Sequence, residues 1–142
     1  MPHKIVIVED DTMNAKLFQL VLTRKGGYEV EVTEDPSYLI AQIRSGKVDL
    51  VIMDVSLSNS EMDGRPVDGL EITRRLRAEI ETRHVPVLLA TAHAMKGSRE
   101  QFLRDSGADD YISKPIVDSD DLIQRIQALI AKGSHVVPPA DS

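Results

Sequence analysis

The 142-residue sequence contains no cysteine, which excludes disulfide bonds and thiolate metal sites. It also lacks any run of roughly 18 apolar residues, the length that a membrane-spanning helix needs. Basic residues are few: 17 lysines and arginines face 23 acids, and the net charge of −6 argues against general affinity for nucleic acid or anionic membranes. No basic and apolar leader is visible at the N-terminus, so we expect a cytoplasmic protein.

Acidic residues directly follow two short apolar runs. Residues 4–8 (Lys-Ile-Val-Ile-Val) lead into Glu9 and Asp10, and residues 50–53 (Leu-Val-Ile-Met) lead into Asp54. Such β-branched runs predict buried parallel strands, whose carboxyl ends meet at the sheet edge where ligands bind. Three carboxylates without a basic residue among them would repel one another unless a cation joined them, and Mg²⁺ suits oxygen ligands. The sequence therefore predicts a magnesium site at this edge.

Strand and helix patterns alternate along the whole chain. Five strands are expected, at residues 4–8, 28–33, 50–54, 86–90 and 110–113. Apolar residues at helical spacing follow each strand, and Asp35-Pro36 is typical of the start of a helix. Five βα units with right-handed crossovers predict a flavodoxin-like α/β fold, a doubly wound parallel sheet in the order 2-1-3-4-5. The order reverses between the first and third strands, which are the two strands that carry the acids.

Three helices are expected in the second half of the chain, and the middle one is polar, runs through Arg99, Phe102 and Leu103 and ends at Gly107. Helical spacing predicts one with an apolar stripe of Ile72, Leu76 and Ile80. Its outer face is predicted to be basic and solvated, through Arg74, Arg75 and Arg77. The last helix is predicted to end before residue 133. Residues 133–142 contain two prolines and no periodicity, so we expect one domain of residues 3–132 followed by a flexible tail.

Four short motifs coincide with the predicted strand ends. They are Val-Glu-Asp at 8–10, Met-Asp-Val at 53–55, Ala-Thr-Ala at 90–92 and Ser-Lys-Pro at 113–115. In this order and at these places, they resemble the receiver domain of two-component response regulators over about residues 3–132. Segments 14–18, 91–97 and 111–116 are most similar to stand-alone receivers of the DivK type. A chain of that type would be a phosphorylation switch without an attached output domain.

The resemblance implies how the acidic residues would act. Asp54 would accept a phosphoryl group from a sensor histidine kinase or a histidine phosphotransfer protein. Asp10 would be the principal Mg²⁺ ligand, and Glu9 would hold the metal largely through water. Asp54 itself and the backbone carbonyl of Ser56 would complete the protein ligands. Receivers catalyse their own phosphorylation and dephosphorylation, but the resemblance does not imply a dedicated enzyme.

The remaining motifs imply a switch. Lys114 would pair with Asp54 and then with the phosphoryl oxygens, and its peptide bond to Pro115 would be cis. Thr91 would move its hydroxyl onto a phosphoryl oxygen, and Tyr111 would follow it inward. The surface of the fourth helix, fifth strand and last helix would then change. We expect protein partners, including an unknown downstream target, with no direct nucleic acid or membrane binding, in a monomer or weak dimer.

Two other classes share parts of this pattern. A flavodoxin-like FMN protein would need a loop rich in Ser, Thr and Gly after the first strand, where the acids at 9–11 would repel phosphate. A Mg²⁺-dependent phosphatase of the haloacid dehalogenase class stays the alternative function. That class needs an acid two residues after its nucleophilic aspartate, whereas Asp10 is followed by Asp11 and Thr12. Asp11 is predicted to cap a helix rather than to bind metal.

One stretch departs from the receiver pattern. Receivers usually carry a short loop after the phosphoacceptor, with a proline near its start, but here Leu57 is followed by Ser58. Residues 58–67 lengthen this loop by about seven residues. Because Asp-Gly occurs at both 63–64 and 68–69, the start of the third helix is ambiguous. The loop is either solvated or a lid or partner contact beside the site. His93 is likewise either a surface residue or one that tunes phosphoryl lifetime.

Overall fold

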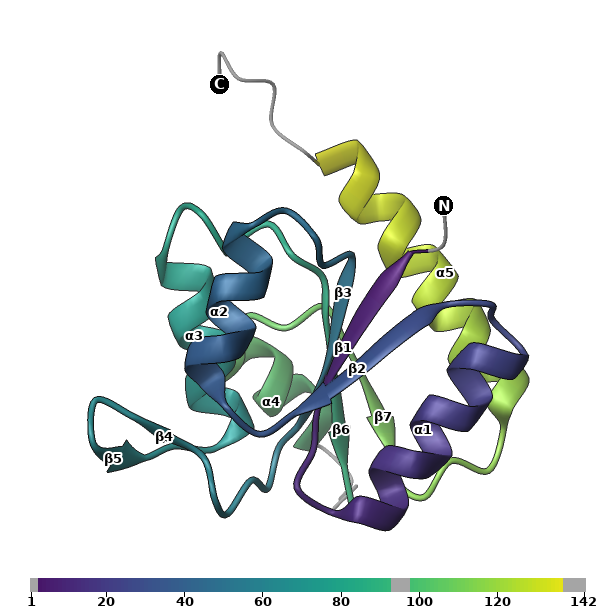
Figure 1. Ribbon diagram of the computed structural model, residues 1–142, viewed down its shortest axis with the longest axis horizontal. Helices are drawn as coiled ribbons and strands as arrows, with labels where there is room; N and C mark the ends of the chain where they lie inside the picture. Colours follow the sequence, from purple (N-terminus) through teal and green to yellow (C-terminus); the bar gives the residue numbers. More distant parts are fainter. Residues whose placement is uncertain (1–2, 93–97, 137–142) are drawn as a thin grey trace.

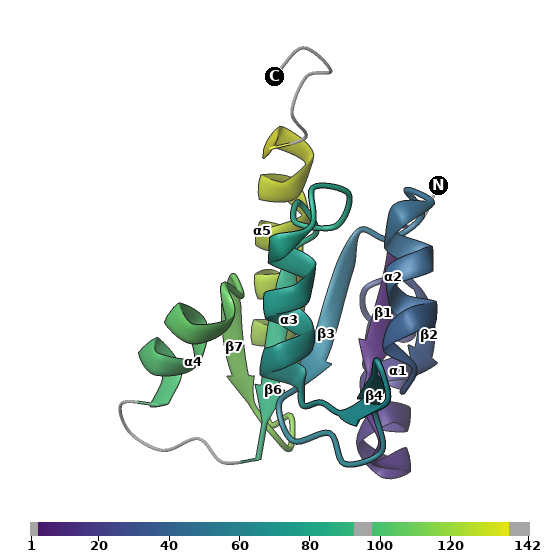
Figure 2. The same cartoon turned by 90° about the vertical axis from the view of Figure 1, so that its left-hand side faces the viewer.

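The parallel sheet at the centre of the molecule is shown in Figures 1 and 2. The structure is a computed structural model, and it describes residues 3–92 and 98–136. The strands of the sheet are β1 (Lys4–Val8), β2 (Glu29–Thr33), β3 (Leu50–Asp54), β6 (Val87–Thr91) and β7 (Asp110–Ser113). They are all parallel and lie in the order β2-β1-β3-β6-β7. The predicted flavodoxin-like α/β fold and its strand order are confirmed.

Helices cover both faces of the sheet (Figure 1). One face carries α1 (Thr12–Arg24) and α5 (Ser119–Val136), and the other carries α2 (Pro36–Arg44), α3 (Gly69–Ala78) and α4 (Ser98–Ser106). In β1, Ile5 and Ile7 pack toward α1 and α5, whereas Val6 and Val8 pack toward α2 and α3. A strand buried on both faces needs apolar residues at every position, which is why β1 reads as an uninterrupted run. In the described ranges, no helix combines the length and apolarity needed to cross a bilayer.

Acidic caps set the starts of the helices. Asp11 accepts hydrogen bonds from the N–H groups of the first turn of α1, so its predicted role as a cap is confirmed. Asp35 caps α2, and Pro36 occupies the first helical position. Asp68 and Glu71 form a reciprocal capping box at the start of α3. Each cap places its helix directly after a strand or loop at the carboxyl edge of the sheet.

Two predicted helix ends are wrong. α3 ends at Ala78, and Glu79 is extended, so Ile80 lies outside the helix with 72% of its surface exposed. The predicted apolar stripe of α3 therefore stops at Leu76. α5 continues to Val136, so the boundary predicted after residue 132 falls inside the helix. A glycine inside a helix costs only about 1 kcal/mol relative to alanine, so Gly133 does not force the helix to end. Residues 137–142 of the predicted tail lie outside the described residues.

Arg77 is not on a solvated face. Its guanidinium donates to the backbone carbonyls of Val85 at 2.7 Å and Gly107 at 2.8 Å, and it pairs with Asp109 at 2.7 Å. The long side chain thus lies along the protein and ties the end of α3 to the segments that lead into β6 and β7. The other two arginines of this predicted face are exposed, as expected.

The long segment after β3 folds into a β-hairpin. β4 (Glu61–Met62) pairs with β5 (Arg65–Pro66) in the antiparallel direction. Asp63 and Gly64 form the turn, with φ angles of 56° and 77°. Positive φ at both central positions is typical of the type I′ hairpin turn, for which Asp-Gly is a favoured pair. The ambiguity is therefore resolved: the first Asp-Gly pair makes the hairpin turn, and the pair at 68–69 starts α3.

The base of the hairpin is packed against the domain. Ser60 is buried, and its hydroxyl donates to the backbone carbonyl of Glu34 at 2.6 Å. Val67 is buried in the core and donates its N–H to the carbonyl of Ser60 at 3.0 Å. The alternative of a merely solvated loop is wrong for these two positions. The hairpin is a structured element that projects from the carboxyl edge of the sheet, beside α2 and α3 (Figures 1 and 2).

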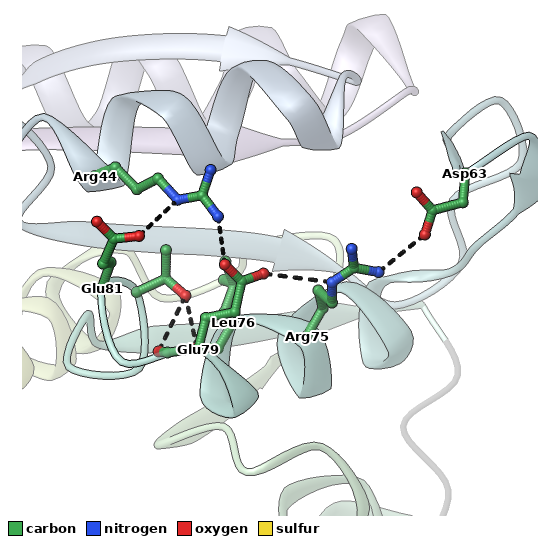
Figure 3. A network of polar contacts seen from close by, with 7 residues as sticks. Arg44, Asp63, Arg75, Leu76, Glu79 and Glu81 are labelled. Atoms are coloured by element: carbon green, nitrogen blue, oxygen red, sulfur yellow. Dashed lines mark hydrogen bonds and ion pairs between the residues drawn. The ribbon is translucent and has the colours of Figure 1, made fainter.

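A chain of ion pairs links the hairpin to α3 and α2 (Figure 3). Asp63 at the hairpin turn pairs with Arg75 at 3.2 Å, and Arg75 pairs with Glu79 at 3.4 Å. Glu79 in turn contacts Arg44, which also pairs with Glu81 at 3.4 Å. Exposed ion pairs contribute only about 0–1 kcal/mol each, so the network orients the hairpin more than it stabilises the domain.

Candidate functional site

Three carboxylates meet at the carboxyl edge of the sheet. Glu9 and Asp10 follow β1, and Asp54 ends β3, its neighbour in the sheet. Each offers one oxygen that lies within 4.8 Å of the oxygens offered by the other two. Glu9 and Asp54 are both about 3% exposed, whereas Asp10 is only partly buried. The structure therefore brings together the three acids that the sequence proposed.

Lys114 places a positive charge among these acids. Its ammonium lies 3.1 Å from Asp54 Oδ1 and 2.9 Å from Glu9 Oε1, and only 7% of its side chain is exposed. The pairing with Asp54 was expected, but the closer contact with Glu9 was not. The backbone N–H of Lys114 donates to the carbonyl of Thr91 at 2.8 Å, and its peptide bond to Pro115 is cis, as expected. One ammonium against three carboxylates still leaves the site with excess negative charge.

The surroundings perturb the pKa values of Glu9, Asp10 and Lys114 differently. Burial and the hydrogen bond with Asp54 raise the pKa of Glu9 from its ordinary 4.5 to about 7, against the lowering effect of Lys114. Partial burial acts to raise the pKa of Asp10, but hydrogen bonds from the Ser58 hydroxyl and N–H lower it below its ordinary value. Burial opposes the charge of Lys114, yet hydrogen bonds to Glu9 and Asp54 raise its pKa. Glu9 therefore changes charge near neutral pH.

The titration of Glu9 predicts how stability depends on pH. A folded-state pKa of about 7 against 4.5 means that the metal-free folded state holds more protons than the unfolded state between these pH values. Stability should therefore fall as the pH rises through this window. Glu9→Gln lacks this titrating carboxyl group. The unfolding free energy of the wild type minus that of the variant should therefore fall by about 1–3 kcal/mol between about pH 5 and pH 8. Urea unfolding in EDTA measures it, and a difference independent of pH would contradict the assignment.

The other predicted residues surround the acids. Ser56 follows β3 directly, and its N–H donates to Asp54 Oδ1 at 3.1 Å. Thr91 is the last residue of β6 and is fully buried. Tyr111 is buried on β7, with its ring centroid 5.9 Å from that of Phe102 on α4. Thr91 and Tyr111 therefore lie on neighbouring strands, between the acids and α4. His93 lies outside the described residues.

Gly69 is a residue of the site that the sequence did not single out. A Cβ on this glycine would lie 2.0 Å from the carbonyl oxygen of Asp54 and 2.9 Å from Met53 Cγ. Its N–H donates to the carbonyl of Val55 at 3.2 Å. Only glycine lets α3 begin directly against the backbone of the proposed acceptor. The signal for this role was the Asp68-Gly69 pair, but the pair at 63–64 looks the same in the sequence.

Gly69→Ala should therefore damage the site as well as the fold. The added methyl group forces α3 away from β3, so we expect a loss of about 1–3 kcal/mol in unfolding free energy and slower labelling of the protein by a phosphodonor. Gly46→Ala is a matched control, because it places alanine at a positive φ in the segment between α2 and β3, outside the site and the hairpin, and should cost about 1–2 kcal/mol without changing the labelling rate. Urea unfolding and labelling rates measure both effects. Equal labelling rates in the two variants would remove Gly69 from the site.

Comparison with known proteins identifies the class of the chain. Residues 5–127 match the family model of the response regulator receiver domain. The chain therefore belongs to the response regulator receiver domain family, whose members accept a phosphoryl group and act as switches in two-component signalling. Within that family it is similar to the polar-differentiation response regulator DivK of Brucella anthropi, at 40% identity over 116 residues, which cover 82% of this chain and 87% of DivK.

Receiver domains also occur as parts of larger relatives. Hybrid signal transduction histidine kinase I of Dictyostelium discoideum is 38% identical over 120 residues, which cover 82% of this chain but 7% of the kinase. The chain thus spans only a small part of that relative, and nearly the whole of DivK.

Solved structures agree with this assignment. A putative response regulator of Chloroflexus aurantiacus has 30% identity and a TM-score of 0.77, over 92% of this chain and 99% of its own. The receiver domain of a sensor histidine kinase from Pseudomonas aeruginosa PAO1 has 30% identity and a TM-score of 0.75 over the same shares. That domain holds a magnesium ion coordinated in its active site cleft. The alternative of a phosphatase gains no support from any of these relatives.

Proposed function

We propose that Asp54 is the phosphoryl-accepting residue of this receiver and that acceptance depends on Mg²⁺. The observation that carries the proposal is the cluster at the carboxyl edge of the sheet. Asp54 is buried there, contacts Lys114 and the N–H of Ser56, and lies beside two further carboxylates. A buried carboxylate with a cation at one side and a metal-binding acid at the other can attack phosphorus without repelling its oxygens.

The donor set of the site fits a magnesium ion. Glu9, Asp10 and Asp54 offer carboxylate oxygens within 4.8 Å of one another, and the carbonyl of Ser56 would add a fourth oxygen. These are the hard oxygen ligands that Mg²⁺ prefers. When bound, Mg²⁺ would supply positive charge to the phosphoryl oxygens. Lys114 offsets only part of the charge of the three acids, so a divalent cation is needed before a phosphoryl donor can approach.

The transfer itself requires little covalent chemistry from the protein. A carboxylate oxygen of Asp54 forms a bond to phosphorus while the bond between phosphorus and the donor breaks, and the donor group leaves with the electron pair and takes up a proton. Lys114 then exchanges its contact with Asp54 for a phosphoryl oxygen. The Thr91 hydroxyl donates to another phosphoryl oxygen. Attack by water on the acyl phosphate returns Asp54 and inorganic phosphate, so the receiver resets itself without being a dedicated enzyme.

The phosphodonor would be a sensor histidine kinase or a histidine phosphotransfer protein. α1 carries an exposed apolar stripe at helical spacing, formed by Met13, Leu17 and Leu20. The stripe begins in the first turn of α1, directly after Asp10 and the cap Asp11. A protein that brings a phosphohistidine to Asp54 must also cover the surface next to it, so the stripe is the expected contact for that partner.

The downstream target would bind on the side of β7 and α5. A pocket there is lined by apolar residues of both elements and of the segment between them, including Pro115, Ile116 and Leu122, together with the charged residues Asp118, Asp121 and Arg125. Val117, at its edge, is 93% exposed. Tyr111 lines the same pocket and lies on the strand next to Thr91. A movement of Thr91 onto the phosphoryl group would therefore change this surface through Tyr111.

Phosphorylation by a small donor tests the proposal. The purified chain should gain the mass of one phosphoryl group when incubated with acetyl phosphate and Mg²⁺, and it should lose that mass again without any added phosphatase. EDTA should prevent the gain, because the three carboxylates then lack the cation that offsets their charge. No mass gain with Mg²⁺, or an equal gain with EDTA, would contradict the proposal. Intact-protein mass spectrometry makes the measurement.

A further inference from the structure

Ser58 makes two hydrogen bonds to one oxygen of Asp10. Its N–H donates to Asp10 Oδ2 at 2.9 Å, and its hydroxyl donates to the same oxygen at 2.7 Å. The two residues are 48 positions apart in the sequence, so the contact depends on the return of the chain after β3. Ser58 is the first residue of the inserted segment 58–67. Proline, which receivers usually carry near the start of this loop, has neither of these donors.

The backbone around Ser58 is held in place. Leu57 before it is buried in the core, and Ser60 two positions later is buried with its hydroxyl on the carbonyl of Glu34. Val67 closes the base of the hairpin through its bond to Ser60. The Ser58 side chain is itself exposed, so changing it would leave no cavity. The two donors are therefore presented to Asp10 by a fixed backbone, and the insertion provides part of that backbone.

The placement of these bonds determines their effect. Both donors engage Oδ2, and neither engages Oδ1, so the carboxylate is turned and held while one oxygen stays available to a cation. Hydrogen bonds of this kind, made to a metal-binding residue by a neighbour that does not touch the metal, typically change metal affinity by about 10–100-fold. Without Ser58, the partly exposed carboxylate of Asp10 would rotate freely and would have to be ordered when the metal binds.

We propose that Ser58 is a positioning residue that orients Asp10 for Mg²⁺ and so makes the metal affinity of this receiver depend on its hairpin insertion. The inference rests on the proposed role of Asp10 as a metal ligand and assigns a further residue to the same site. Ser58 acts through Asp10, whereas Asp54, Thr91 and Lys114 would contact the phosphoryl group. The hairpin is then part of the metal site and not only a surface beside it.

Mg²⁺ titrations of four proteins test this inference. Ser58→Ala removes the hydroxyl but keeps the N–H, so its dissociation constant for Mg²⁺ should rise about tenfold, at the lower end of the range for such residues. Ser58→Thr keeps both donors and should bind Mg²⁺ like the wild type. Asn59→Ala is a matched control, because Asn59 is the next residue of the same loop and its side chain contacts Glu34 and not Asp10. Isothermal titration calorimetry measures the affinities.

Thermal unfolding separates positioning from a general structural effect. All four proteins should have the same Tm in EDTA, and Mg²⁺ should raise the Tm of Ser58→Ala less than that of the other three. Unchanged or tighter Mg²⁺ binding by Ser58→Ala would overturn the inference, as would an equal loss in Asn59→Ala. If the wild type itself bound no Mg²⁺, the proposed metal site would fail, and the inference with it. If the wild type bound Mg²⁺ and Ser58→Ala bound it equally well, the inference alone would fail.

Discussion

Asp54→Asn should abolish acceptance of the phosphoryl group while leaving the domain folded. Asparagine keeps the shape of the side chain, but its amide oxygen is not a nucleophile toward phosphorus. The fold should persist, because removing one charge from a cluster of three acids and one lysine relieves repulsion as well as losing the ion pair with Lys114. We expect labelling by acetyl phosphate with Mg²⁺ to fall to background, as measured by intact-protein mass spectrometry.

Asp11→Asn is the matched control for this experiment. Asp11 directly follows Asp10 in the sequence, but it caps α1 and is not among the three clustered carboxylates. Asparagine caps helices about as well as aspartate, so this variant should fold and be labelled like the wild type. Circular dichroism melting checks that both variants are folded. A phosphoryl group retained by folded Asp54→Asn would show that another residue is an acceptor.

Asp10→Ala should nearly eliminate Mg²⁺ binding. The variant loses a proposed direct ligand, so its dissociation constant for Mg²⁺ should rise by at least about 100-fold. This rise should exceed the one expected for Ser58→Ala, which changes a neighbour of the ligand. Labelling by acetyl phosphate should fall with it, because the charges of Glu9 and Asp54 are then offset by Lys114 alone. Calorimetric titration gives the affinity, and labelling over a range of Mg²⁺ concentrations gives the functional consequence.

The Asp10→Ala experiment has two informative controls. Asp11→Asn should again bind Mg²⁺ normally, which separates a loss of the ligand from a change in the charge of the surface. Ser58→Ala should lie between wild type and Asp10→Ala, because it disturbs the orientation of the ligand without removing it. Undiminished Mg²⁺-dependent labelling of Asp10→Ala would contradict the assignment of Asp10 as a ligand.

The fold was predictable because local signals and the global arrangement agree. β1 and β3 read as continuous apolar runs since both of their faces are buried, and each run is followed by an acid that is itself buried at the carboxyl edge of the sheet. Asp35-Pro36 marked the start of α2 at the correct residues. Acids at the ends of adjacent parallel strands must meet, so Glu9, Asp10 and Asp54 could be grouped from the sequence and the strand order alone.

The parts that escaped prediction depend on contacts between distant residues. The hairpin could not be distinguished because both Asp-Gly pairs fit the same local pattern, and only the packing of Val67 and Ser60 separates them. The hydrogen bonds from Ser58 to Asp10 and the ion pair between Lys114 and Glu9 join residues far apart in the sequence. No local pattern reports such contacts.

Two other residues were misjudged for related reasons. Arg77 is a charged residue close to Arg74 and Arg75, as expected for a solvated helix face. However, the loops before β6 and β7 approach it and accept its hydrogen bonds. Gly69 looked like an ordinary residue at the start of a helix, and its importance is visible only from the distance between α3 and the backbone of Asp54. In both cases the sequence predicted the element correctly but not what packs against it.

Chemical trapping of the phosphorylated residue tests the central claim most directly. Borohydride reduces an aspartyl phosphate to homoserine, so the modified position can be read from peptide masses. After reaction of the wild type with acetyl phosphate and Mg²⁺, we predict homoserine at position 54 and unmodified aspartate at positions 10 and 11. Homoserine at another position, with Asp54 unchanged, would contradict the account.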